Sequence, residues 1–121
     1  MANEVRSYRD LVVWQKAVEF VTEIYRLTHT FPKEEMFGLM SQMRRAAVSI
    51  PSNIAEGHGR LSRKEYIHFL GNARGSMAEL ETQVIIVVNL GYLDEGKTNR
   101  LLEQAGELGR ILNGLLASLR K

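Results

Sequence analysis

Six basic side chains and only two acidic ones lie between residues 41 and 75, and these cations are the groups with the most evident chemistry. The basic residues are Arg44, Arg45, Arg60, Arg63, Lys64 and Arg74, and the acidic ones are Glu56 and Glu65. Guanidinium and ammonium groups bind phosphate oxygens through charge-assisted hydrogen bonds. The local excess of positive charge makes these residues candidates for a nucleic-acid contact, whereas the net charge of +2 is too small to indicate one.

The six cations fall into two groups of three. Arg60, Arg63 and Lys64 lie where one predicted helix ends and the next begins, and a helix start adds free amides and the positive end of a dipole. We expect these three to form the outer nucleic-acid contact. The other three lie inside predicted helices and are expected to have a mixed structural role, with Glu79 or Glu81 pairing an arginine: Arg44, Arg45 and Arg74.

A second polar set alternates with the apolar residues of the two central helices. Its members are Ser49, Asn53, Ser76, Glu79 and Gln83. The simpler interpretation is a network of hydrogen bonds between helices, which must be satisfied and therefore fixes their register. The alternative is that the polar surface, with its arginines, faces phosphates.

No residue pattern indicates catalysis, a metal or a cofactor. The three histidines are His29, His58 and His68; the first two lie at helix ends, and the third is off the apolar stripe of its helix. A di-iron bundle needs several glutamates and histidines on inward faces. Phosphate-binding loops, dinucleotide fingerprints and nucleophile elbows are absent. We therefore expect no enzyme activity, no metal and no cofactor.

The elements that must position the cations are four helices, predicted near residues 10–29, 34–57, 62–90 and 94–119. Each segment carries apolar residues at alternating spacings of three and four, as an amphipathic helix does. The stripe of the second segment runs from Met36 to Ile54, and that of the third from Tyr66 to Val87. Short connections make neighbouring helices antiparallel, so the sequence predicts an all-α, up-and-down four-helix bundle.

Local signals support these boundaries. Ser62 with Glu65 has the spacing of a capping box, and Asp94 is typical of a helix N-cap. Gly57 and Gly91 are expected to end their helices in the left-handed conformation. Pro51 removes one helical hydrogen bond, which predicts a bend or, less conservatively, a break that shapes a binding surface.

Length and composition are those of one domain over residues 1–121, with 45% hydrophobic and 25% charged residues. There is no cysteine, which suits a reducing compartment. The N-terminus is polar, and the longest apolar run, Val84 to Val88, is far shorter than a membrane span. These features predict a cytoplasmic protein without a membrane partner.

Four stretches of the sequence resemble a known family. They are residues 8–17 (YRDLVVWQKA), 31–35 (FPKEE), 38–47 (GLMSQMRRAA) and, most specifically, 49–57 (SIPSNIAEG). Together the chain from Tyr8 to Leu119 resembles the bacterial four-helix bundle proteins encoded by intervening sequences of 23S rRNA genes, which carry a ribosomal-protein label. It is also similar to the accessory variability determinant of diversity-generating retroelements, a basic pentamer that partners a reverse transcriptase.

The resemblance implies a homopentameric ring and carries over no catalytic residue. A double row of apolar residues on the first helix is wider than one helix partner can cover, and together with the resemblance it predicts a homo-oligomer. The leading hypothesis is a non-enzymatic oligomer that binds RNA, or an RNA-containing complex, through repeated basic patches. The alternative is a protein-interaction scaffold that docks a nucleic-acid-handling enzyme.

Overall fold

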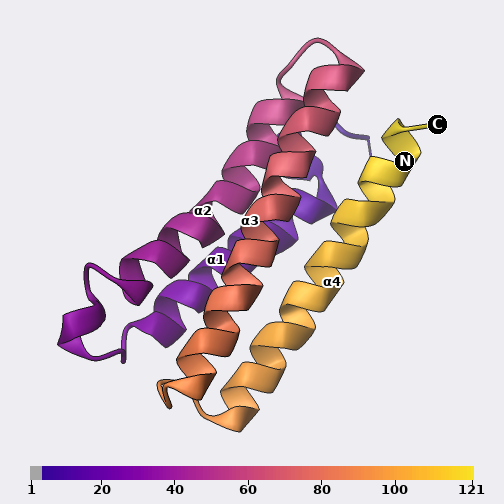
Figure 1. Ribbon diagram of the computed structural model, residues 1–121. Helices are drawn as coiled ribbons and strands as arrows, with labels where there is room; N and C mark the ends of the chain where they lie inside the picture. Colours follow the sequence, from indigo (N-terminus) through magenta and orange to yellow (C-terminus); the bar gives the residue numbers. More distant parts are fainter. Residues whose placement is uncertain (1–3) are drawn as a thin grey trace.

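The computed structural model describes residues 4–121, and residues 1–3 of the predicted domain and of its polar N-terminus lie outside that range. The described chain folds into an antiparallel bundle of four helices (Figure 1). They are α1 (Val12–Thr28), α2 (Leu39–His58), α3 (Arg63–Asn89) and α4 (Glu95–Leu119). Two short 3₁₀ turns precede α1 and α2: η1 (Tyr8–Asp10) and η2 (Lys33–Glu35). The predicted all-α, up-and-down fold is confirmed.

Each helix packs against its neighbours in the sequence, and α1 against α4 closes the bundle. The core contains the residues that the stripes predicted, among them Met43, Ile50, Ile54, Leu70, Met77, Leu80, Leu108 and Leu112. Of the two rows on α1, the row from Val13 to Ile24 is buried, while Val18 and Tyr25 of the other row are exposed. None of the helices in residues 4–121 combines the length and apolar character needed to cross a membrane.

The second helix begins five residues later than predicted, at Leu39 instead of position 34. The residues between belong to η2 and to a turn over residues 36–38, and the backbone of Gly38 (φ −111°, ψ −117°) is not helical. A carboxylate oxygen of Glu35 accepts a 3.1 Å hydrogen bond from the Leu39 amide and so satisfies a free donor of the new helix start. Met36, predicted to lie in the core stripe, is consequently outside the helix and 48% exposed.

The glycines at the helix ends behave differently from each other. Gly91 has a φ of +79° and ends α3 as predicted. Gly57 was predicted to be a left-handed cap, and this is wrong, because α2 continues to His58 with Gly57 buried inside it. A Cβ atom on Gly57 would lie 2.8 Å from the Cβ of Phe69, so the glycine is needed for the close approach of α2 and α3.

The caps and the proline complete the comparison with the predicted elements. Asp94 caps α4, and Ser62 caps α3 by accepting a bond from the Glu65 amide. The Glu65 carboxylate bonds with the Ser62 hydroxyl rather than with its backbone amide, so only the serine half of the predicted capping box forms. Pro51 is buried within an uninterrupted α2, which excludes a break; the predicted bend stays a prediction.

Candidate nucleic-acid interface

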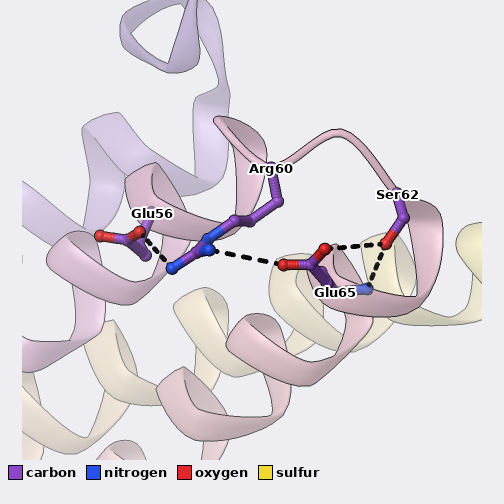
Figure 2. A network of polar contacts seen from close by, with 4 residues as sticks. All are labelled: Glu56, Arg60, Ser62 and Glu65. Atoms are coloured by element: carbon purple, nitrogen blue, oxygen red, sulfur yellow. Dashed lines mark hydrogen bonds and ion pairs between the residues drawn. The ribbon is translucent and has the colours of Figure 1, made fainter.

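Arg60 lies at the connection between α2 and α3 and is held by three contacts. Its guanidinium is 2.8 Å from the carboxylate of Glu56 and 3.5 Å from that of Glu65 (Figure 2). It also lies over the ring of Phe69, 4.9 Å from the centroid, in a cation–π arrangement. The positive charge of Arg60 is therefore largely balanced within the protein, and its contacts position the connection and the start of α3.

The other two cations of this connection have weaker restraints. Arg63 and Lys64 occupy the first turn of α3 and are exposed. Arg63 donates a 3.5 Å bond to the backbone carbonyl of Lys121, next to the end of α4. Within residues 4–121, neither Arg63 nor Lys64 has the side-chain carboxylate of an aspartate or glutamate within ion-pairing distance. Their charges remain available to a ligand.

The antiparallel fold adds two cations that sequence reasoning missed. The start of α3 and the end of α4 lie at the same end of the bundle, so Arg120 and Lys121 join Arg63 and Lys64 there (Figure 1). All four side chains are exposed. The predicted topology could have indicated this grouping, because an antiparallel neighbour places the last turn of α4 beside the first turn of α3. We call Arg63, Lys64, Arg120 and Lys121 the basic end.

The arginines inside the helices are mostly occupied by contacts between helices. Arg44 donates a 2.9 Å bond to the Thr28 hydroxyl and a 3.2 Å bond to the Tyr25 carbonyl, and lies 4.5 Å from the Tyr25 ring centroid. These contacts join α2 to α1. Arg74 similarly reaches α4, where it lies 3.4 Å from the side-chain oxygen of Asn113.

The predicted pairing of an arginine with Glu79 or Glu81 is wrong. No ion pair in residues 4–121 involves either glutamate. The reason is direction, since Arg44 points from α2 towards α1, whereas both glutamates lie on the exposed surface of α3. Arg45 is exposed and makes no hydrogen bond or ion pair with the described residues.

The five residues of the polar set lie in two separate groups. The hydroxyls of Ser49 and Ser76 bond to each other and join α2 to α3, while the Asn53 amide donates to the Ser49 carbonyl at 2.8 Å. Glu79 and Gln83 bond to each other, at 3.4 Å, along α3. The first group links helices, but the second is local to one helix.

Two tyrosines have a raised pKa, each for a different reason. Burial raises the pKa of Tyr66, whose hydroxyl has no hydrogen-bond partner among the described residues. The pKa of Tyr92 is raised mainly by its 2.9 Å hydrogen bond to the carboxylate of Glu35, and then by desolvation and negative charge nearby.

One metal-type spacing does occur, Glu65 followed three residues later by His68. The structure places both side chains on the exposed surface, with Glu65 directed to Ser62 and Arg60 instead of into the bundle. In residues 4–121, no three histidine, aspartate or glutamate side chains are grouped as metal ligands.

The chain is similar to one protein family and to solved structures of the same fold. The family model described as 23S rRNA-intervening sequence protein matches residues 9–114. A protein of unknown function from the S23 ribosomal protein family of Bacteroides thetaiotaomicron VPI-5482 has the same fold, with a TM-score of 0.81. The two are 22% identical, and the match covers 88% of this chain and 96% of the other. No curated protein matches the chain. Because the family model covers most of its length, the chain belongs to the 23S rRNA-intervening sequence protein family.

Proposed function

We propose that the protein is a non-enzymatic oligomeric module that binds RNA, or an RNA-containing complex, through its basic end. The observation that carries the proposal is the meeting of four exposed cations from two helices, Arg63, Lys64, Arg120 and Lys121. Their ammonium and guanidinium groups can contact successive phosphates, and copies in an oligomer add weak contacts by avidity. The family description, which names 23S rRNA intervening sequences, is in keeping with an RNA partner.

The proposal changes the roles first expected for the arginines. Arg60 becomes a positioning residue, because two carboxylates and an aromatic ring already hold it. Arg44 and Arg74 likewise have contacts across helices. The phosphate contact is assigned to the exposed cations that gather at the basic end, none of which pairs with an aspartate or glutamate in residues 4–121.

The test is a triple variant, Arg63→Ala, Lys64→Ala and Arg120→Ala, with RNA binding measured over a range of salt concentrations. The slope of log K against log salt is negative, and each lost contact to a single-stranded phosphate should make it less steep by about 0.7. The slope of the triple variant should therefore be about 2 units less negative than that of the wild type. Helicity and oligomer mass should not change, because all three side chains are exposed.

A matched control removes three exposed cations at the opposite end: Lys33→Ala, Lys97→Ala and Arg100→Ala. It has the same net charge as the test variant and should bind RNA nearly as the wild type does. If both variants lose RNA affinity equally, the loss comes from the change in net charge and not from the basic end. An unchanged slope in the test variant would show that the basic end does not contact RNA.

The alternative function, a scaffold that docks a nucleic-acid-handling protein, is favoured by a different region. Large apolar side chains are exposed at the opposite end of α2, beginning with Phe37, which is 91% exposed. Exposed apolar patches on soluble proteins commonly mark protein contacts. If the wild type binds no RNA at low salt but retains a protein partner from its host, the scaffold is the better account.

A further inference from the structure

A groove lies on the outer surface between α1 and the start of α2. It has a volume of about 460 Å³, and its lining combines apolar side chains with arginines. Tyr25, Met36, Phe37 and Val48 are all exposed there, with Phe37 standing almost free of the protein. Four large apolar side chains grouped on one surface form a patch of the kind that another macromolecule usually covers.

The two arginines give the groove positive charge, and Arg44 also holds the Tyr25 ring in place. Arg44 is held against Tyr25 by its bond to the Tyr25 carbonyl and by its position over the ring. Arg45, one residue further along, is exposed and has no bonded partner among the described residues. The groove therefore offers an ordered aromatic wall and two arginines that pair with no carboxylate in residues 4–121, and it should accept an apolar surface that carries a carboxylate.

The same chain has such a surface on the outer side of α3. Ile85 and Ile86 are 56% and 41% exposed, and Glu81 lies one helical turn before Ile85. Glu81 has no cation within 4.0 Å in residues 4–121.

We infer that the groove of one copy receives the α3 surface of a second copy, with Arg45 beside Glu81 of the neighbouring chain. The two surfaces complement each other in both respects, apolar against apolar and cation against carboxylate. Because they lie on different helices, two copies joined by this contact still have a free α3 surface on one copy and a free groove on the other. Such a heterologous contact repeats, giving a ring where the rotation closes and a filament where it does not.

This inference deepens the oligomeric part of the proposed function and assigns it a contact. An RNA strand is the other candidate occupant, because bases stack on aromatic side chains beside arginines. A second copy is favoured because an apolar protein surface buries the methionine and valine side chains of the lining better than a nucleic acid does. The matching surface, with its unpaired Glu81, is also present on every copy.

The test is a charge exchange measured by light scattering and sedimentation. Arg45→Glu and Glu81→Arg alone should each place like charges together and weaken self-association by about tenfold or more. The double variant restores opposite charges and should recover most of the wild-type association. Control reversals at exposed positions on α4, Arg100→Glu and Glu103→Arg, should change the mass distribution little.

Phe37→Ala is the apolar counterpart. The side chain is nearly fully exposed, so its loss should leave the thermal unfolding of the protomer unchanged while self-association falls. If the single reversals leave a wild-type oligomer intact, or if the double variant is weaker than both singles, the assigned contact is wrong. If Arg45→Glu and Phe37→Ala keep the mass but weaken RNA binding, the groove is an RNA site and the inference falls.

The same measurements separate this inference from the proposed function. A wild type that is monomeric at micromolar concentration overturns the oligomeric part of the proposed function and the contact with it. A stable wild-type oligomer that ignores the charge reversals overturns only the contact. Loss of RNA binding in the basic-end variant, with the mass unchanged, supports the proposed function whatever the groove does.

Discussion

The two connections at the ends of α2 are built from similar parts but present different surfaces. Each uses a glutamate near a helix start: Glu65 bonds with Ser62 and Arg60, and Glu35 bonds with the Leu39 amide and the Tyr92 hydroxyl. The α2–α3 connection balances one arginine internally and leaves other cations exposed. The α1–α2 connection exposes two apolar side chains, Met36 and Phe37, next to the groove, whereas the α2–α3 connection exposes one, Leu61, beside its cations.

This difference shows how one small bundle can carry two independent surfaces. Exposed ammonium and guanidinium groups stay hydrated and suit phosphates, which bind through charge and respond strongly to salt. Exposed aromatic and thioether side chains suit another protein surface, where burial of apolar area supplies most of the free energy. The distance along α2 between the two connections allows each surface to be changed without the other.

Among the variants that test the difference between the two connections, Gly57→Ala, next to the α2–α3 connection, should change the free energy of unfolding most. Gly57→Ala places a methyl group 2.8 Å from the Cβ of Phe69, and overpacking of this kind costs about 1–3 kcal/mol. Better helix propensity offsets about 1 kcal/mol of this, so we expect a net destabilisation of up to about 2 kcal/mol in denaturant unfolding.

Gly75→Ala is the matched control for that variant. It also adds a methyl group within a helix, but in open space, and should stabilise the protein by about 0.5–1 kcal/mol. Equal effects at the two glycines would mean that α2 and α3 do not approach as closely as the structure shows.

A smaller effect, specific to the same connection, is expected from Ser62→Ala. The substitution leaves the Glu65 amide without its 3.1 Å acceptor and should lower the free energy of unfolding by about 1 kcal/mol. Because Glu65 also contacts Arg60, hydrogen exchange should quicken in the first turn of α3 and stay unchanged at Leu39. Faster exchange at both helix starts would show that the two connections are coupled.

The smallest expected effect on stability comes from the α1–α2 connection, and it depends on pH. The hydrogen bond to Glu35 raises the pKa of Tyr92 above its ordinary value of 10.0. A raised pKa favours the protonated phenol in the folded state, so the contribution is complete below about pH 10 and disappears as pH rises through the folded pKa. Tyr92→Phe removes this bond and this titration.

The measurement is the stability difference between wild type and Tyr92→Phe from neutral pH to beyond pH 10. The wild-type advantage should be constant at first and then shrink. An advantage that grows with pH would contradict the bond, and Glu35→Gln should reproduce the loss of the pH dependence if Glu35 is its cause.

Sequence reasoning located the helices and the core because both depend on local periodicity. Leu80 and Leu112 are buried as predicted, and Ser62, Asp94 and Gly91 mark helix ends through their own side chain or backbone. It failed where a contact comes from elsewhere in the chain. Gly57 has the pattern of a helix cap, but it lies inside α2, where Phe69, twelve residues later, approaches too closely for a side chain at this position.

For the candidate site, too, the sequence predicted the local features, and the tertiary structure determined those that depend on distant residues. The sequence alone determined an all-α bundle, its family and a group of cations near the second helix junction, since residue types and spacing are local properties. Only the tertiary structure decided which cations are free: it balanced Arg60 with Glu56 and Glu65, turned Arg44 towards α1, and brought Arg120 and Lys121 to the start of α3. The physical reason is that a charge is compensated, or left free, by the groups around it in space.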